Sequence, residues 1–176
     1  MKILLGVTGS VACYKALDLT RLFAKNGHDV QVIMSKTAAG WISPVLFGAL
    51  CGNDALTDED YYSSGMLHID LCRDRDAFVI APATANIIAQ CAHGLAPSLI
   101  TSSYLYFPGT TWFAPAMNPN MYDHPTVQTN IRHLMEHGCE ILEPAEGVVA
   151  CGDKGRGKLM DVNEIYTRVV GKPPEK

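Results

Sequence analysis

The chain has 176 residues, of which 48% are hydrophobic and 18% are charged, and its formal net charge is −4. A chain of this length and composition can bury a substantial core, which excludes an intrinsically disordered protein. The weakly acidic balance gives no basic footprint for nucleic acid. No apolar run approaches the ~20 residues of a membrane-spanning helix, so we expect neither nucleic acid nor a membrane as a partner.

The sequence opens on a strand pattern, without the apolar segment and small-residue cleavage site of a secretory signal. None of the six cysteines belongs to a C-x-x-C pair, and we therefore expect reduced thiols in a cytoplasmic protein. No internal repeat or low-complexity linker divides the chain. These features predict one domain over residues 1–170, followed by a tail at 171–176.

Short apolar runs, typical of buried strands, alternate with apolar residues at helical spacing. Serine, threonine, proline and glycine mark the ends of the helices. In chain order, the pattern predicts a strand at 2–7, a helix at 12–26, a strand at 29–35, a helix at 43–50, a strand at 77–81, helices at 84–94 and 97–106, a strand at 110–114, a helix at 125–138, a strand at 140–142 and a last helix from 161.

Strands separated by helices predict an α/β fold, in which helices cover both faces of a doubly wound parallel sheet. Ligands of such sheets bind beyond the carboxyl ends of the strands. The candidate binding segments are therefore the loops at 8–11, 35–37, 82–86 and 114–122, together with the segment that packs over them.

The first two of these loops carry small and hydroxyl side chains. Gly9 and Ser10 lie between the first strand and its helix, where backbone N–H groups can bind a phosphate. Ser35 and Thr37 follow the second strand in the same way. The stretch is neither G-x-G-x-x-G nor a Walker motif, and tight turns also favour glycine and serine. A phosphate site and a plain turn therefore both stay open.

The third and fourth loops are also polar. In "APATANIIAQ" (81–90), Thr84 could act only as a helix N-cap. Small polar turns at three neighbouring strand ends nevertheless favour one phosphorylated planar ligand that spans them. The fourth loop, "APAMNPNMYDHP" (114–125), is rigid because of its three prolines, and it combines two amide side chains with two methionines.

Two stretches contain histidines that could be functional. His68 precedes the third strand, near the end of the sheet, which makes it a candidate catalyst, although a lone histidine is commonly a surface or core residue. The stretch "HLMEH" (133–137) matches a zinc-peptidase pattern. Its Leu134 and Met135 are needed for the buried face of a helix and no third ligand follows, so we expect no metal.

The segment "ACGDKGRGKL" (150–159) combines three glycines with basic side chains and Cys151. This composition is typical of a flap that closes over a site. A surface loop with a small buried thiol is the simpler alternative.

Together, these stretches resemble the flavin-dependent cysteine decarboxylases over residues 2–161. The family's P-A-S-A-N-T motif corresponds to "PATANI" (82–87), and its P-x-M-N-x-x-M-W motif to "PAMNPNMY" (115–122). The resemblance implies a flavodoxin-like, Rossmann-type fold. It also implies that FMN binds at the subunit interfaces of a homotrimer, or of a dodecamer built from trimers.

The resemblance further implies site residues, carried over motif by motif. His68 matches the family's active-site histidine, Asn118 and Met121 match its substrate loop, and Cys151 matches the cysteine of an A-C-G motif. The residues implied to contact FMN are Gly9, Ser10, Val11, Ser35, Thr37, Thr84, Ala85, Asn86, Ile87 and Ala116.

The chain departs from the family pattern at three places. Ile87 stands where the family has threonine, and Tyr122 stands where it has tryptophan. Ala96-Pro97-Ser98 covers the place of an acidic–amide pair. The first two changes keep bulk or apolar character, and the third concerns flavin or subunit contacts.

Within the family, the chain looks most similar to members that decarboxylate 4′-phosphopantothenoylcysteine to 4′-phosphopantetheine in coenzyme A synthesis. In that scheme FMN oxidises the cysteine side chain to a thioaldehyde, carbon dioxide leaves, and the enethiolate is reduced again. Asn118 would hold the carboxylate, and His68 would accept or orient the thiol proton. Cys151 would donate a proton in the last step. Lys154 and Arg156 would contact the substrate phosphate.

Several alternatives stay open within this resemblance. The basic flap residues, to which Lys158 also belongs, could be only solvated charges. The chain could instead be a peptidyl-cysteine decarboxylase that releases the enethiol, a flavin prenyltransferase, or a regulatory homologue without activity. Cys151 favours the complete redox-neutral cycle, and the presence of His68 and Asn118 favours an enzyme. The ligase that makes the substrate is often fused C-terminally in bacteria, and the 176 residues leave no room for it. Either a separate ligase exists, or this sequence is part of a longer protein.

Overall fold

A central sheet of parallel strands organises the chain, with the strand order β3-β2-β1-β4-β5-β6. In this computed structural model, residues 1–171 are described, apart from the side chain of Ser64. The strands are β1 (Lys2–Val7), β2 (Asp29–Met34), β3 (Leu56–Thr57), β4 (Ala77–Ala83), β5 (Thr111–Pro115) and β6 (Glu140–Ile141).

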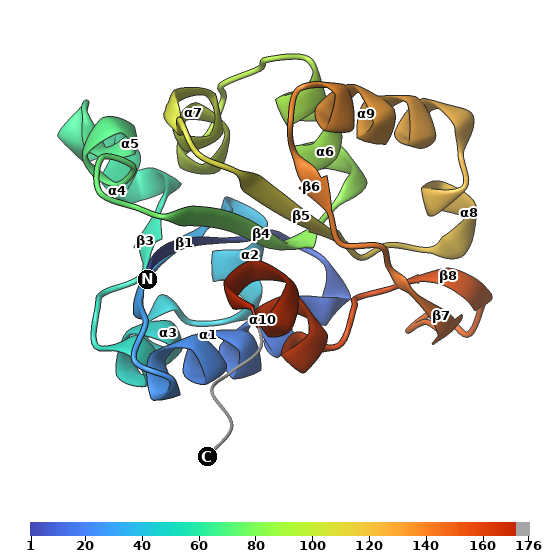
Figure 1. The fold of residues 1–176 in the computed structure, drawn as a ribbon, viewed down its shortest axis with the longest axis horizontal. Coiled ribbons are helices and arrows are strands. Elements are labelled where there is room, and N and C mark those ends of the chain that lie inside the picture. Colours follow the sequence, from blue (N-terminus) through green and yellow to red (C-terminus); the bar gives the residue numbers. More distant parts are fainter. Residues whose placement is uncertain (172–176) are drawn as a thin grey trace.

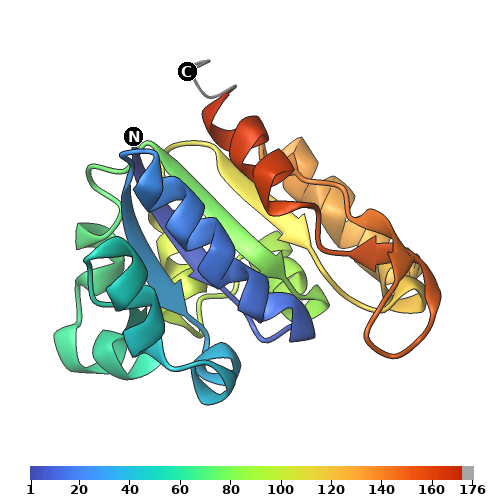
Figure 2. The same ribbon diagram turned by 90° about the horizontal axis from the view of Figure 1, so that it is seen from below.

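Helices cover both faces of this sheet (Figure 1). One face is covered by α1 (Lys15–Lys25), α3 (Pro44–Cys51) and α10 (Val162–Val170), as Figure 2 shows from below. The other face is covered by α6 (Ala85–Ala92), α7 (Leu99–Tyr106) and α9 (Pro125–Glu136), with α4 (Asp58–Ser64) and α5 (Leu67–Asp70) beside α7. The remaining short helices are the 3-10 turn η1 (Val11–Tyr14), α2 (Lys36–Trp41) and α8 (Pro119–Tyr122).

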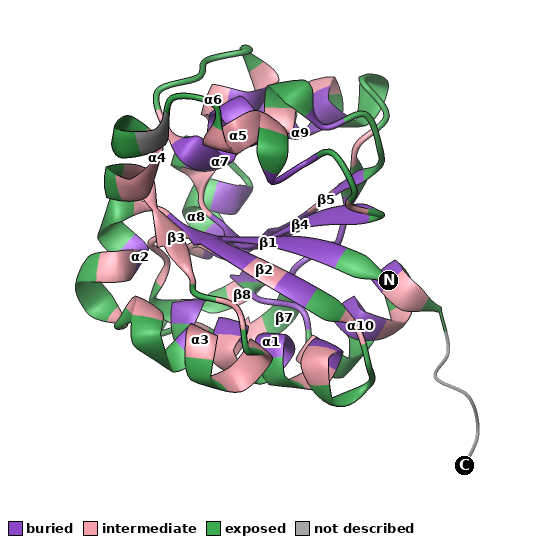
Figure 3. Cartoon of the chain, turned by 90° about the vertical axis from the view of Figure 1, so that its left-hand side faces the viewer, coloured by how far each residue is buried: buried purple, intermediate pink, exposed green. Residues whose placement is uncertain are grey.

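The first strand shows why the sheet is buried on both faces. Ile3, Leu5 and Val7 pack into the core beside α1, whereas Leu4 packs into the opposite core, because successive side chains of a strand point to opposite faces. All four side chains are fully buried, as the purple sheet of Figure 3 shows. Each such burial contributes roughly 1.5–3 kcal/mol. Continuous apolar strands therefore match two helical layers.

Every predicted strand and helix is present, with ends shifted by a few residues. The helix α1 ends at Lys25 with Asn26 as its C-cap, and Gly27 follows with a φ of 79°, which glycine adopts without a steric penalty. The α/β prediction is confirmed. Without the two-residue β3, the strand order is that of flavodoxin-like sheets, and with β3 it is that of the dinucleotide-binding sheet.

The expected flap is an antiparallel hairpin of β7 (Ala145–Val148) and β8 (Lys154–Lys158). Its sequence lacks alternating apolar residues, so the strands were not predictable from periodicity. Within residues 1–171, no helix has the length and apolar character that crossing a membrane requires. The predicted domain limit at residue 170 stays a prediction, and residues 172–176 of the expected tail lie outside the described part of the chain.

Candidate active site

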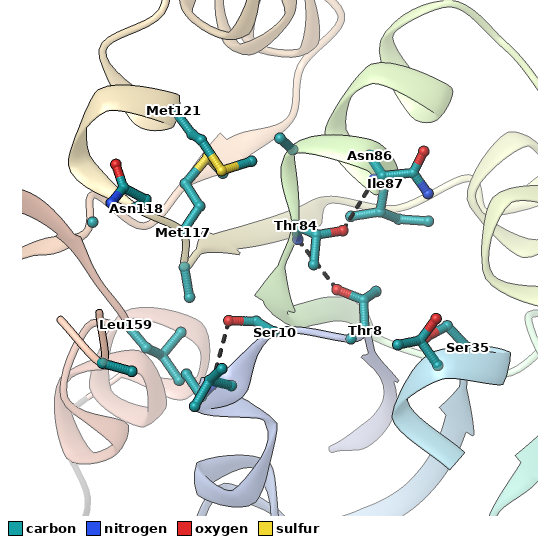
Figure 4. Close-up of a pocket in the computed structure, with 18 of the residues that line it drawn as sticks. Thr8, Ser10, Ser35, Thr84, Asn86, Ile87, Met117, Asn118, Met121 and Leu159 are labelled. Carbon is teal, nitrogen blue, oxygen red and sulfur yellow. Dashed lines mark hydrogen bonds between the residues drawn. The ribbon is translucent and has the colours of Figure 1, made fainter. Parts of the chain in front are cut away.

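A cavity of about 870 Å³ opens beyond the carboxyl ends of the strands. Its walls come from the loops after β1, β2, β4 and β5 and from the β7–β8 hairpin (Figure 4). The volume lies in the range of cavities that hold cofactors and drug-sized ligands. The position agrees with the general rule for ligands of parallel sheets.

The loops after β1 and β2 touch each other at Gly9. A Cβ atom at this position would lie 2.4 Å from Cγ2 of Thr37, closer than real atoms approach. Only glycine therefore fits here, and the backbone at this end of the cavity stays bare of side chains. The hydroxyls of Ser10 and Ser35 accept hydrogen bonds from Ala12 N and Ala38 N, both at 3.3 Å. Each hydroxyl keeps its own hydrogen to donate to a ligand.

A buried threonine joins the loop after β1 to the loop after β4. Thr8 Oγ1 donates to the carbonyl of Pro82 at 2.7 Å and accepts from the N–H of Thr84 at 3.2 Å. Thr84 Oγ1 in turn accepts from Ile87 N at 3.3 Å and caps α6. Thr84 is thus an N-cap as well as a residue of the cavity wall, and both loops are held rigidly.

The loop after β5 forms the opposite wall. Figure 4 shows Met117, Asn118 and Met121 on this side, across from Thr84 and Asn86 of the β4 loop. Asn118 Oδ1 accepts from Asn120 N at 2.8 Å and so begins α8. The wall combines polarizable thioethers with one oriented amide, as the composition of the loop predicted.

The β7–β8 hairpin packs directly onto this loop. Met117 N donates to the carbonyl of Gly157 at 3.0 Å, and a Cβ atom on Gly157 would lie 2.2 Å from the carbonyl oxygen of Met117. The turn of the hairpin brings Cys151 to the cavity. Asn118 Nδ2 donates to Cys151 Sγ at 3.1 Å and to Asp153 Oδ2 at 2.6 Å. The segment predicted as a flap is thus docked over the cavity.

Two basic residues of the hairpin, Lys154 and Arg156, do not lie in the cavity as the resemblance implied. Arg156 Nη2 lies 3.7 Å from Asp123 Oδ1, and its guanidinium lies 5.6 Å from the ring centroid of Tyr122, so it points onto α8 and not into the cavity. Lys154 is exposed outside the cavity. Lys158 lines the cavity instead.

The tyrosine that replaces a motif tryptophan has a defined environment. Tyr122 is buried, and its hydroxyl donates to Glu143 Oε2 at 2.5 Å. Burial raises the pKa of Tyr122, and the hydrogen bond to Glu143 raises it further. Gln128 Nε2 donates to the carbonyl of Tyr122 at 2.6 Å. Tyrosine therefore satisfies this buried position with a partner of its own.

The atypical 96–98 segment also reaches the cavity, through Pro97 and Ser98. Ser98 caps α7 by accepting from Thr101 N at 3.3 Å. Asp58 Oδ1 accepts from Leu99 N at 2.9 Å, and Asp58 itself lines the cavity. A carboxylate from α4 thus lies beside the segment that departs from the family pattern.

His68 is far from this constellation. It lies on α5 with its ring against Tyr61, at a centroid distance of 5.5 Å and an interplanar angle of 85°, and it does not line the cavity. Its Nδ1 is buried and has no hydrogen-bond partner among the described residues. Figure 1 places α5 beside β3, at the opposite side of the molecule from the β7–β8 hairpin. One chain therefore does not bring His68 and Cys151 together.

Residues 1–171 contain no group of three or more histidine, cysteine or acidic side chains arranged to hold a metal ion. His133 and His137 of the "HLMEH" stretch pack edge to face, with ring centroids 4.5 Å apart and an interplanar angle of 75°, at the end of α9.

A family model described as "Flavoprotein" matches residues 1–173. The chain belongs to this flavoprotein family. It is 39% identical over 174 residues to the probable phosphopantothenoylcysteine decarboxylase of Streptococcus mutans, and the match covers 96% of each chain. It is also 41% identical over 165 residues to the coenzyme A biosynthesis bifunctional protein CoaBC of Bacillus subtilis. That match covers 93% of the chain but only 41% of CoaBC, so the chain spans about two fifths of this longer relative.

Solved structures of similar proteins agree with this assignment. A PPC decarboxylase with a cysteine-to-serine change, in complex with pantothenoylaminoethenethiol, has a TM-score of 0.87 at 29% identity, covering 96% of this flavoprotein and 95% of the other chain. The FMN-dependent cysteine decarboxylase SpaF has a TM-score of 0.82 at 30% identity, covering 96% and 94%.

The cavity of the flavoprotein unites most of the residues expected from its sequence. Gly9, Ser10, Val11, Ser35, Thr37, Thr84, Ala85, Asn86, Ile87, Ala116, Asn118, Met121 and Cys151 line it, whereas His68, Lys154 and Arg156 do not. Sequence reasoning placed Thr8 and Met117 in the candidate loops without giving either a role, and it did not identify Asp58 or Asp153. Nothing in the sequence around Asp58 signals its place in the cavity wall.

Proposed function

We propose that this flavoprotein is an FMN-dependent decarboxylase that converts 4′-phosphopantothenoylcysteine to 4′-phosphopantetheine, a step of coenzyme A biosynthesis. The names of the similar proteins support the substrate and the reaction. The observation that carries the proposal is the hydrogen bond from Asn118 to Cys151 at the wall of a large cavity. It joins a carboxylate-binding amide to a thiol that can donate a proton.

The cavity fits FMN. The bare backbone at Gly9 and the hydroxyls of Ser10, Ser35 and Thr37 suit a phosphate, since they offer donors without bulk. The side chains of Val11, Ile87 and Ala116 offer an apolar surface for the flat ring, between Ser10 and Asn118. When bound, FMN supplies the hydride acceptor that oxidises the substrate thiol to a thioaldehyde and later the hydride that reduces the product. The remaining residues proposed to hold it are Thr84, Ala85 and Asn86.

Asn118 is proposed to bind the carboxylate that is lost. A neutral amide holds a carboxylate without the strong pairing that would stabilise the ground state over the transition state. Met121, half exposed at the cavity, packs against the substrate. Among the basic residues proposed for the phosphate, Lys158 lines the cavity, whereas Lys154 and Arg156 lie outside it. Lys158 is therefore our choice for this contact.

His68 is proposed to accept or orient the proton of the substrate thiol. Because His68 and Cys151 lie on opposite sides of one chain, the histidine must come from a second copy, which supports a homotrimer or a dodecamer of trimers. The buried Nδ1 of His68 has no hydrogen-bond partner within residues 1–171, which fits a role that needs another molecule. Large apolar side chains exposed on α4, α7 and the segments beside them fit a subunit interface. They are Tyr62, Met66, Leu95, Leu105 and Tyr106.

Cys151 is proposed to hold the proton for the substrate carbon that loses carbon dioxide. The thiol faces the cavity, is exposed, and accepts a hydrogen bond from Asn118, so it lies beside the expected position of the carboxylate. The donated proton lets the reaction end at the saturated thiol. Without it, the reaction would stop at the enethiol that a peptidyl-cysteine decarboxylase releases.

Mass spectrometry of the products tests this proposal. The FMN-loaded protein should convert 4′-phosphopantothenoylcysteine to a product lighter by about 44 mass units, the mass of carbon dioxide. Cys151→Ser should give a product lighter by about 46, because two hydrogens are not returned. His68→Asn should give no product. An inert or colourless wild-type protein would overturn the proposal and favour a regulatory homologue.

We also propose a cytoplasmic location and a single FMN-binding domain over residues 1–170. All six cysteines are free thiols, which fits a reducing compartment. The longer CoaBC relatives extend well beyond the matched part. The reaction that joins the cysteine to its acyl partner must be supplied by another domain or chain.

A further inference from the structure

Both donors of the Asn118 amide are already engaged by the hairpin. Nδ2 donates to Cys151 Sγ at 3.1 Å and to Asp153 Oδ2 at 2.6 Å. The Cys151 thiol also lies 3.5 Å from the same Asp153 oxygen. An amide nitrogen has only two hydrogens, so the group proposed to bind a carboxylate holds a carboxylate of its own chain.

The orientation of this amide is fixed by its other end. Asn118 Oδ1 accepts the backbone N–H of Asn120 at 2.8 Å, and a backbone N–H can only donate. Nδ2 therefore points to the hairpin, because the reversed amide would place two donors against each other. The contact with Asp153 is charge-assisted and short, which makes it the stronger of the two bonds.

We propose that Asp153 is a built-in substitute for the substrate carboxylate: in the substrate-free protein it occupies the Asn118 amide, and the substrate must displace it. The inference rests on the proposed function. It requires only that the ligand carry a carboxylate and bind at Asn118.

The negative charges of Asp153 and the substrate carboxylate mean that one must replace the other at Asn118, because they cannot both bind there. Asp153 and a substrate carboxylate are both negative, and two carboxylates on one nitrogen repel each other. After the exchange, one hydrogen of Nδ2 holds the substrate and the other still holds Cys151. The thiol would then lie next to the carbon that loses carbon dioxide. The same contact thus closes the hairpin over the cavity in the absence of substrate and prepares the position of the proton donor.

Binding of two matched ligands tests this inference. The first is 4′-phosphopantothenoylserine, whose hydroxyl replaces the reacting thiol, and the second is the same compound without its carboxylate. Their Kd values for the FMN-loaded wild type, Asp153→Asn and Asp153→Ala are measured by calorimetry. Glu146→Gln removes a charge from β7 of the same hairpin without a contact to Asn118, and it serves as the control.

We expect Asp153→Ala, which removes the competing hydrogen bond, to bind the carboxylate ligand about three- to tenfold more tightly. Asp153→Asn keeps an acceptor oxygen but loses the charge, and it should show a smaller gain. The ligand without a carboxylate should change by less than about twofold, as should both ligands on Glu146→Gln. Three results would each overturn the inference. The Asp153 variants could bind the carboxylate ligand no more tightly than the wild type, they could gain affinity equally for both ligands, or Glu146→Gln could gain as much as they do.

The failure of the inference is distinguishable from the failure of the proposed function. If the wild type binds the carboxylate ligand and turns over the cysteine compound, but the Asp153 variants show no selective gain, only the inference is wrong. If the wild type binds neither ligand, the proposed substrate and the inference are both wrong.

Discussion

At the scale of single residues, Gly9 determines the form of the end of the cavity at which we propose that the cofactor phosphate binds. Its missing side chain lets the loops after β1 and β2 come into contact, and it keeps the backbone N–H groups near Ser10 accessible. Asn118 has the corresponding role at the other end, where its amide contacts the turn of the hairpin. Both residues act by fixing the positions of backbone or polar atoms before a ligand arrives.

Gly9→Ala should impair FMN binding, because the new Cβ would lie 2.4 Å from Thr37 Cγ2 and would push the two loops apart. We expect the Kd for FMN to rise roughly tenfold or more, since the steric conflict costs about 1–3 kcal/mol. Titration of the apoprotein with FMN, followed by fluorescence, measures this. Gly40→Ala in α2 meets open space and should bind FMN like the wild type. Equal affinities of the two variants would contradict the account.

Most residues of the cavity could be predicted from the sequence because they lie in short motifs at strand ends. Thr84 and Asn118 are examples, since strand ends of a parallel sheet converge whatever the details of packing. The contact of Asn118 with Asp153 could not be predicted, because it depends on how a hairpin of low sequence complexity docks 35 residues later along the chain. The same limit applies to Asp58, which reaches the cavity from a polar helix.

At the scale of elements, the β7–β8 hairpin is the part of the fold that completes the site. It carries Cys151 and Lys158, and it is held on the α8 loop by close backbone packing at Gly157 and by Arg156 over Tyr122. Periodicity predicted a flap but no strands, because "KGRGK" offers no apolar alternation. The two-residue β3 and the four-residue α8 were missed since they are too short for any period.

Gly157→Ala should detach the hairpin, because a Cβ atom would lie 2.2 Å from the carbonyl oxygen of Met117. We expect kcat/KM to fall at least about 100-fold, because displacing a catalytic group by about an ångström has an effect of this size. The FMN content of the variant should stay close to that of the wild type. Gly147→Ala in the same hairpin meets only the end of the Lys158 side chain, at 3.4 Å, and should retain most activity. Normal activity of Gly157→Ala would show that docking of the hairpin is dispensable.

The last helix depends on its N-cap. Asp161 Oδ1 accepts from the side-chain amide of Asn163 at 3.0 Å and from its backbone N–H at 2.9 Å, and these bonds lower the pKa of Asp161 below its usual 3.8. Asp161→Ala should reduce the free energy of unfolding at pH 7 by about 1 kcal/mol. Because the folded pKa is lowered, the contribution of the charge is complete above 3.8 and is lost as the pH falls through the folded value.

Urea unfolding at pH 7 and near pH 3 measures this dependence. The difference in the free energy of unfolding between wild type and Asp161→Ala should narrow at the lower pH. Asp161→Asn, which caps without a charge, should be less stable than the wild type at pH 7 and should differ little from it near pH 3. If the difference in the free energy of unfolding between wild type and Asp161→Ala stays constant with pH, the charge of Asp161 is excluded as the source of the stabilisation.

At the scale of the whole molecule, the proposed catalytic groups are divided between two sides of the chain. The parallel sheet separates β3, α4 and α5, with His68, from β6 and the hairpin, with Cys151. The parallel sheet and both helical layers could be predicted from the alternation of strands and helices. The distance between His68 and Cys151 could not, since sequence patterns do not state which edge of a sheet carries a short polar helix.

Mixing two variants that each lack the complete redox-neutral reaction tests whether subunits share sites. His68→Asn keeps Cys151, and Cys151→Ser keeps His68, so a site between two copies can be intact when both variants are present. After unfolding and reassembly of an equal mixture, about one quarter of the sites should be complete, and roughly that share of wild-type activity should return. The activity measured here is formation of the product lighter by about 44 mass units, and each variant treated alone should form none of it. No recovery in the mixture would mean that one chain forms the whole site.

The most direct test of the account is anaerobic turnover of 4′-phosphopantothenoylcysteine in large excess over the FMN-loaded protein, with product mass and amount measured together. A redox-neutral cycle that ends with proton donation from Cys151 needs no outside electron acceptor. The account therefore predicts many product molecules per flavin, each lighter than the substrate by about 44 mass units. A single turnover that leaves the flavin bleached and the product lighter by about 46, or no turnover at all, would contradict it.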